Sequence, residues 1–218
     1  MTRNPEKILL VEGKDELRVI PELIEKNGVI WKLNTNKTVV HIEEYDGKEN
    51  LVNPFEISAK LKESSLIALG IIIDADDNPL GSWKSIRNAA LKSIPDIPED
   101  LPDNGLIHTT SEGIKFGIWI MPDNKMQGML ETFLTYLIPT GNDELWQFAQ
   151  EVTQDAKSKN AAFQDSHRDK ANIYTWLSWQ DPPGRQMHQA ITEHILDPNH
   201  PNAQKFVTWF KTLYGLTD

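Results

Sequence analysis

Residues 66–78 read LIALGIIIDADDN, and this stretch decides the fold that we expect. Its first eight residues are apolar or glycine and rich in isoleucine, without the polar alternation that a half-exposed strand shows. Such a run is typical of a strand that is covered on both faces, as in a parallel sheet. The strand must leave the core at Asp74, because burying a run of carboxylates is very costly.

Asp74 and Asp76 therefore lie where the strand ends. In open α/β sheets, ligands bind beside the carboxyl ends of the strands. Two aspartates at this spacing can both turn towards one cation as the chain leaves the pleat, and Mg²⁺ prefers oxygen ligands. The plain alternative is a strand followed by an ordinary turn, which Asn78-Pro79 also favours.

A second strand pattern ends in the same way. Residues 7–11 read KILLV and are followed by Glu12. Gly13 permits a tight turn, and Asp15 and Glu16 then fall in the first turn of a helix, where negative charge suits the helix dipole. The sequence thus places acids at the carboxyl ends of two strands.

The order of the elements indicates a mainly parallel sheet. A β-α-β-α-β-α pattern calls for parallel strands with right-handed crossovers. After the first helix we expect a strand at 38–42, a helix at 51–63, the strand at 66–73, a helix at 81–94, and strands at 105–110 and 115–121 joined by a hairpin-like turn. From residue 142 onward we expect only helices and loops, with helices at 143–158, 170–179, 187–196 and 203–213.

Glu131 stands out in the helix pattern GMLETFLTYL at residues 128–137. Its apolar neighbours spread around much of that helix, which leaves the carboxylate little exposed surface to occupy. We therefore weigh a specific role for Glu131 against the plain reading of a surface carboxylate.

The composition restricts the kinds of function. The chain has 218 residues, which suffice for one large domain or for one domain with an appendage. The absence of cysteine excludes disulfides, zinc–thiolate sites and thiol nucleophiles. A net charge of −10 counts against a protein that coats nucleic acid with its own positive charge, but not against an enzyme whose cation joins carboxylates to a phosphate.

No apolar run reaches the length of a membrane span. The N-terminal residues MTRNPEK contain no apolar segment of the kind found in signal peptides. We therefore expect a cytoplasmic protein without membrane contacts.

Together, VEGKDE at 11–16 and IIIDADD at 71–77 resemble the Toprim domain of topoisomerases, primases and nucleases of the overcoming-lysogenization-defect family. The family pattern is an acid after the first strand and Asp-x-Asp after the third, which Glu12, Asp74 and Asp76 match. The stretch from GIWIMPDN to the Trp-rich tail is also similar to a Toprim-related family of small prokaryotic proteins without assigned function. The resemblance covers roughly residues 5–140 and implies a Toprim-like three-layer α/β sandwich at 1–140, with a helical C-terminal extension at 141–218 packed on it.

The resemblance also implies a set of functional residues. Glu12, Asp74 and Asp76 would bind Mg²⁺ or Mn²⁺, and Glu12 is alternatively a general base. Later acids build a second metal position in the family nucleases, and Asp123 and Glu131 are the candidates here. A lysine beyond the core assists phosphate chemistry in those enzymes; Lys170 is the candidate, with Lys14 as another cation beside Glu12.

Three functions are compatible with these residues. The first is a Mg²⁺-dependent phosphoryl-transfer enzyme, most plausibly a nuclease acting on DNA or RNA, with nucleic acid as its partner. The second is a haloacid-dehalogenase-like phosphatase with Asp74 as nucleophile and Asp76 as acid. That family, however, carries its motif on the first strand and has threonine or valine after the second aspartate, where Asp77-Asn78 stands in this chain. The third is a non-catalytic Toprim-fold module that binds a partner protein or a nucleotide. The oligomeric state is left open.

Overall fold

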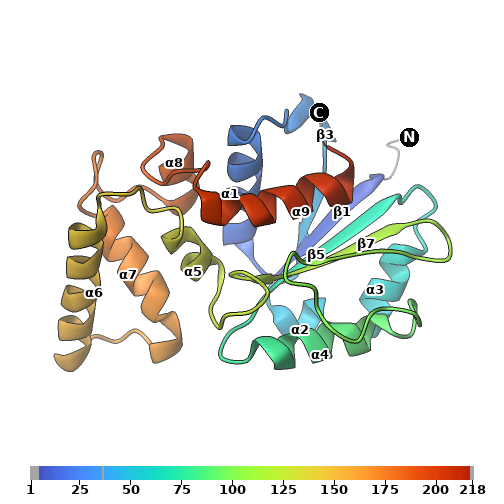
Figure 1. Cartoon of the computed structure of the whole chain (residues 1–218), viewed down its shortest axis with the longest axis horizontal. Coiled ribbons are helices and arrows are strands. Elements are labelled where there is room, and N and C mark those ends of the chain that lie inside the picture. The colour runs from blue at the N-terminus through green and yellow to red at the C-terminus, as the bar shows by residue number, and fades with distance from the viewer. Residues whose placement is uncertain (1–4, 36, 217–218) are drawn as a thin grey trace.

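The structure is a computed structural model that describes residues 5–35 and 37–216. Residues 1–4 of the expected N-terminal domain and 217–218 of the expected extension lie outside the described residues, as does residue 36. A central sheet has helices on both of its faces, and the helices α6 (Asp143–Ser158) and α7 (Arg168–Leu177) stand together at one side of it (Figure 1).

In the described part of the chain, a five-stranded sheet has the order β4-β1-β5-β7-β6. Its strands are β1 (Lys7–Val11), β4 (His41–Glu44), β5 (Ala68–Asp74), β6 (Leu106–Thr109) and β7 (Lys115–Met121). β1 pairs in parallel with β4 and β5, and β5 pairs in parallel with β7. Only the hairpin pair β6–β7 is antiparallel, so the three strands β4, β1 and β5 end at the same edge. The short strands β2 (Lys32–Asn34) and β3 (Lys37–Thr38) form a separate antiparallel pair.

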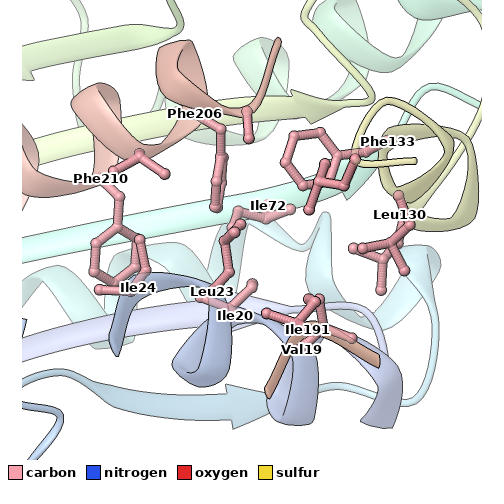
Figure 2. Close-up of a cluster of buried hydrophobic side chains, with 14 of the residues drawn as sticks. Val19, Ile20, Leu23, Ile24, Ile72, Leu130, Phe133, Ile191, Phe206 and Phe210 are labelled. Carbon is pink, nitrogen blue, oxygen red and sulfur yellow. The ribbon is translucent and has the colours of Figure 1, made fainter. Parts of the chain in front are cut away.

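The central strands are buried on both faces, as their apolar runs predict. Along β5, Ile72 belongs to one hydrophobic cluster, whereas Ile71 and Ile73 belong to a second cluster on the other face. Figure 2 shows Ile72 between side chains of two helices, with Leu23 on one side and Phe206 on the other. The same alternation directs Asp74, the last residue of β5, to the face on which Ile72 lies.

Helices complete a three-layer arrangement (Figure 1). α1 (Lys14–Lys26) and α9 (Gln204–Tyr214) lie on the face of Ile72, and α8 (Met187–Thr192) packs on α1. The other face is covered by α2 (Lys48–Leu51), α3 (Pro54–Leu61) and α4 (Pro79–Ala90). The predicted α/β class with a mainly parallel sheet is confirmed.

The last helix packs directly on the sheet, because two glycines leave room for it. A Cβ atom on Gly117 would lie 2.5 Å from Leu213 Cδ2, and a Cβ atom on Gly70 would lie 3.0 Å from the same atom. The buried Tyr214 hydroxyl donates a 2.8 Å hydrogen bond to the carbonyl oxygen of Ile8 in β1. The segment after residue 141 thus supplies part of the sheet's cover, while its status as a separate extension stays a prediction.

The remaining helices lie beyond this sandwich. They are α5 (Leu130–Thr135), α6 (Asp143–Ser158) and α7 (Arg168–Leu177), with the short 3-10 helices η1 (Asp165–His167) and η2 (Pro201–Ala203). α6 packs on α7, and α5 connects this pair to the sheet. Within residues 5–35 and 37–216, no helix has the length and apolar character needed to cross a membrane.

Two predicted elements are each divided in the structure. The expected strand 38–42 is divided between β3 and β4, and between them the Thr38 hydroxyl donates to the carbonyl oxygen of Val40 at 2.7 Å. The expected helix 51–63 is two helices, because Pro54 has no N–H to continue α2 and instead begins α3. The Asn53 side chain caps α3.

Candidate active site

The acids that end β1 and β5 are in contact. Glu12 follows β1 directly, Asp74 is the last residue of β5, and the two strands are parallel neighbours. The backbone N–H of Asp74 donates a 2.8 Å hydrogen bond to Glu12 Oε1. The fold therefore brings together two carboxylates that are 62 residues apart in the sequence.

Two buried glutamates face Asp74 from the helices on its side of the sheet. Glu16 in the first turn of α1 is 6% exposed, and Glu131 in α5 is 4% exposed. The N–H of Leu130, the residue before Glu131, donates to Asp74 Oδ1 at 3.1 Å and so ties α5 to the end of β5. Asp76 lies two residues beyond Asp74 with a positive φ of 52°, and its backbone pairs with that of Gly128.

Burial and like charge act together on these acids. Burial raises the pKa of Asp74 well above its ordinary value, and the charges of Glu12, Glu16, Glu131 and Asp76 raise it further. Burial is also the main cause that raises the pKa of Glu12, while the Asp74 N–H and Lys48 act in the opposite direction. The pKa of Glu16 rises to about 7, first through burial and then through Glu12 and Glu131. A cation at this edge of the sheet would relieve the repulsion.

Two lysines neutralise the acids at the flanks of this group. Lys48 Nζ lies 2.7 Å from Asp76 Oδ2, on one side. On the other side, Lys170 Nζ lies 2.8 Å from Glu131 Oε1 and 3.1 Å from Asp15 Oδ2. Within residues 5–35 and 37–216, no lysine, arginine or histidine forms an ion pair with Glu12, Glu16 or Asp74. These three acids at the centre of the group therefore have no ion-pair partner in the described part of the chain.

Most of the residues expected from the sequence gather here. Glu12, Asp74, Asp76, Glu131 and Lys170 belong to the same group of contacts and charges.

Two others have different surroundings. Asp123 accepts hydrogen bonds from the N–H groups of Lys125 and Met126 at 3.1 and 2.8 Å, and from the Tyr136 hydroxyl at 3.3 Å, so it braces its own loop. The Lys14 side chain is 71% exposed and lies 4.0 Å from Glu44. The roles suggested for both residues stay predictions.

Glu16 and Lys48 lie beside these residues but were not predicted from the sequence as site residues. Glu16 shares a helix face with Ile20 and Leu23, at spacings of four and seven residues, and this apolar periodicity was a signal that the glutamate points inward. Lys48 had no such signal. It follows Gly47, whose φ of 116° sets the turn after β4, and the reach of the lysine depends on that turn.

The donor set suits a hard cation, although it is not preassembled. Every candidate ligand is a carboxylate oxygen, as Mg²⁺ and Mn²⁺ prefer. In the described part of the chain, no three histidine, cysteine, aspartate or glutamate side chains are arranged to hold a metal ion. Each hydrogen bond above uses one carboxylate oxygen, Oε1 in Glu12 and Oδ1 in Asp74, and leaves the second oxygen of each group outside that bond.

Comparison with known structures supports the fold. The C-terminal region of the OLD protein of Xanthomonas campestris pv. campestris, in a structure phased with platinum, is 14% identical with a TM-score of 0.52 over 97% of this chain and 95% of the other. A second structure of that region, phased with mercury, is 14% identical with a TM-score of 0.50 over 98% of both chains. This likeness shows a Toprim-like α/β fold across nearly the whole chain.

A comparison with curated protein sequences finds no match. A family model does match, over residues 6–215, and covers both the sheet and the helices after it. The chain belongs to the family described as "Protein of unknown function (DUF3226)".

Proposed function

We propose that this protein is a phosphoryl-transfer enzyme dependent on Mg²⁺ or Mn²⁺, and that it cleaves phosphodiester bonds of DNA or RNA. One observation carries the proposal. Glu12 is hydrogen-bonded to Asp74 at the carboxyl edge of a parallel sheet, the charges of Glu12 and Glu16 act on Asp74, and none of these three acids forms an ion pair in the described part of the chain. A partly buried group of like charges without ion pairs is expected at functional sites, where an ion or a substrate completes it.

Each of these residues would have its own role in the reaction. Glu12, Glu16 and Asp74 would hold the cation, and Asp76 and Glu131 would add negative charge at its flanks. A bound Mg²⁺ would stabilise the charge that develops on the phosphate oxygens. Glu12 Oε2, which is outside the hydrogen bond to Asp74, would take a proton from an attacking water. The raised pKa of Glu12 suits a general base.

Lys170 is the residue that we propose to contact the phosphate. Its side chain is 42% exposed, although its ammonium group is bonded to the buried Glu131. A positive charge held beside a metal site can stabilise the charge on a phosphate oxygen. Its ion pairs with Glu131 and Asp15 raise the pKa of Lys170, so it stays charged throughout the neutral range.

The resemblance to Toprim nucleases of the overcoming-lysogenization-defect family supports the same activity, and the structural likeness to the OLD C-terminal region agrees with it. The net charge of −10 adds a condition. Because the protein repels a phosphate backbone, nucleic acid should bind productively only when a divalent cation is present.

The test is cleavage of supercoiled plasmid and of a single-stranded oligonucleotide by the purified protein in Mg²⁺ or Mn²⁺. We expect nicked or shortened products from the wild type and none from Asp74→Asn. Asp77→Asn is the matched control, because Asp77 is exposed in the same turn and should leave cleavage intact. Equal cleavage by the wild type and Asp74→Asn contradicts the proposal. A wild type that neither cleaves nor binds a divalent ion would favour the non-catalytic binding module.

A further inference from the structure

Lys48 makes contacts that are unusual for a surface lysine. Its ammonium group donates to the carbonyl oxygen of Asp74 at 2.6 Å, to Asp76 Oδ2 at 2.7 Å and to Ser82 Oγ at 2.8 Å. A lysine ammonium has three N–H groups, so all of its donors are used. Its side chain is only 24% exposed, and Ser82 is 5% exposed.

The loop that carries Lys48 is fixed to the edge of the sheet where Glu12 lies. The N–H of Gly47 donates to the carbonyl oxygen of Glu12 at 2.9 Å, and the N–H of Tyr45 donates to that of Val11 at 3.1 Å. β4 and β5 lie on opposite sides of β1, so Lys48 reaches past the end of β1 to the Asp74–Asp76 turn. Its charge acts on Glu12 as well, whose pKa it lowers.

The partners of the ammonium group are those of a hard metal ion. A carbonyl oxygen, a carboxylate oxygen and a hydroxyl oxygen surround it. Its charge also lowers the pKa of Glu12. Divalent ions in phosphoryl-transfer sites take oxygen ligands of the same kinds. Two-metal sites place a second ion about 4 Å from the first. The ammonium of Lys48 contacts the backbone of Asp74, one of the residues that we assign to the first ion.

We infer that Lys48 takes the place of a second metal ion, so that this site binds one divalent cation per chain. The inference rests on the proposed function. In this arrangement Asp76 serves as the partner of Lys48, and the single ion is held by Glu12, Glu16 and Asp74. Lys170 compensates Glu131 in the same manner on the opposite flank.

The experiment is a calorimetric titration of the full-length protein with Mn²⁺, which reports stoichiometry without relying on activity. We expect one ion per chain for the wild type and for Lys48→Arg, which keeps the positive charge. Lys48→Met removes the ammonium and leaves its oxygen ligands in place, so we expect two ions per chain, the second bound more weakly. The double variant Lys48→Met/Asp76→Asn should return to one, because the freed carboxylate is lost.

Lys60→Met is the matched control. Lys60 also joins two acids, Glu43 at 2.7 Å and Glu63 at 3.0 Å, but on another part of the molecule, so its loss should leave the stoichiometry at one. Far-UV circular dichroism verifies that every variant is folded. Two ions in the wild type, or one in a folded Lys48→Met, overturn the inference. If the wild type cleaves nucleic acid and binds two ions, only this inference fails; if it binds none, the proposed function fails too.

Discussion

The backbone N–H of Asp74 donates a hydrogen bond of 2.8 Å to Glu12 Oε1 across the ends of two parallel strands. This bond fixes the Glu12 side chain against the backbone of Asp74. It holds Glu12 within a group of carboxylates that repel one another. Such a group is costly to the folded protein unless a proton or a metal ion reduces its charge. The stability of the protein should therefore report on the state of the site.

Asp74→Asn should increase the stability of the metal-free protein and decrease its cleavage activity. The asparagine keeps the size of the side chain but removes the charge that Glu12, Glu16, Glu131 and Asp76 repel. We expect the metal-free variant to be more stable than the wild type at pH 8, because the asparagine does not repel the neighbouring acids. Cleavage should fall at least about 100-fold, since loss of a metal ligand removes several kcal/mol of transition-state stabilisation. Urea unfolding and plasmid cleavage measure the two effects, and a less stable, active variant would contradict both expectations.

The stability of the metal-free protein should fall as the pH rises. The pKa of Glu16 is about 7 in the folded state against an ordinary 4.5, so between these values the folded protein keeps a proton that the unfolded chain has released. The unfolded state then binds fewer protons, and stability is lost as pH increases through this window. Glu16 alone accounts for a loss on the order of 3 kcal/mol.

Urea unfolding at pH 5 and pH 8 checks this dependence. Glu16→Gln should show a clearly smaller loss than the wild type. Glu25→Gln, an exposed glutamate on the same helix, should behave like the wild type. A wild type that gains stability between the two pH values contradicts the expected direction.

Divalent ions should raise the melting temperature, because they bind the folded site and relieve its repulsion. At an ion concentration about 100 times the dissociation constant, binding contributes about 2.7 kcal/mol. For a chain of this size the shift is roughly 5–10 °C. EDTA should reverse the shift, and Asp74→Asn should show little of it. An equal shift in wild type and variant would place the ion elsewhere.

A double-mutant cycle of Gly117 and Leu213 tests the packing of α9 on the sheet. Gly117→Ala places a methyl group 2.5 Å from Leu213 Cδ2, so we expect a loss of roughly 1–3 kcal/mol. Leu213→Ala alone should cost roughly 2–5 kcal/mol, because Leu213 is fully buried. In the double variant the added methyl group fills part of the cavity, so its loss should be smaller than the sum of the two. Strict additivity would indicate that the helix does not lie on Gly117.

The sequence predicted the strands of the site well, because their cause is local. The apolar runs before Glu12 and Asp74 pack against both faces of the sheet, and each ends in an acid that cannot stay in the core. The long helix at 143–158 has the predicted bounds for the same reason, because its apolar periodicity and its ends depend on residues that are close in the sequence.

Contacts that depend on turns and on tertiary packing could not be predicted in this way. The first-turn position of Glu16 is explained equally well by the helix dipole, and only the packing of α1 on the sheet shows that it is buried. Lys48 crosses from β4 to the end of β5, a contact set by the turn at Gly47. Asp123 has a suitable residue type for a metal ligand, but its Oδ1 accepts from the backbone of its own loop and its Oδ2 from the Tyr136 hydroxyl.

The most direct test of the central claim is the anomalous difference map of a crystal soaked in Mn²⁺. We predict a single peak at the carboxyl edge of the sheet, within roughly 2.0–2.4 Å of oxygens from Glu12, Glu16 and Asp74. We also predict that Lys48 stays bonded to Asp76. A map without a peak at these acids, or with a peak in the place of the Lys48 ammonium, would contradict the claim.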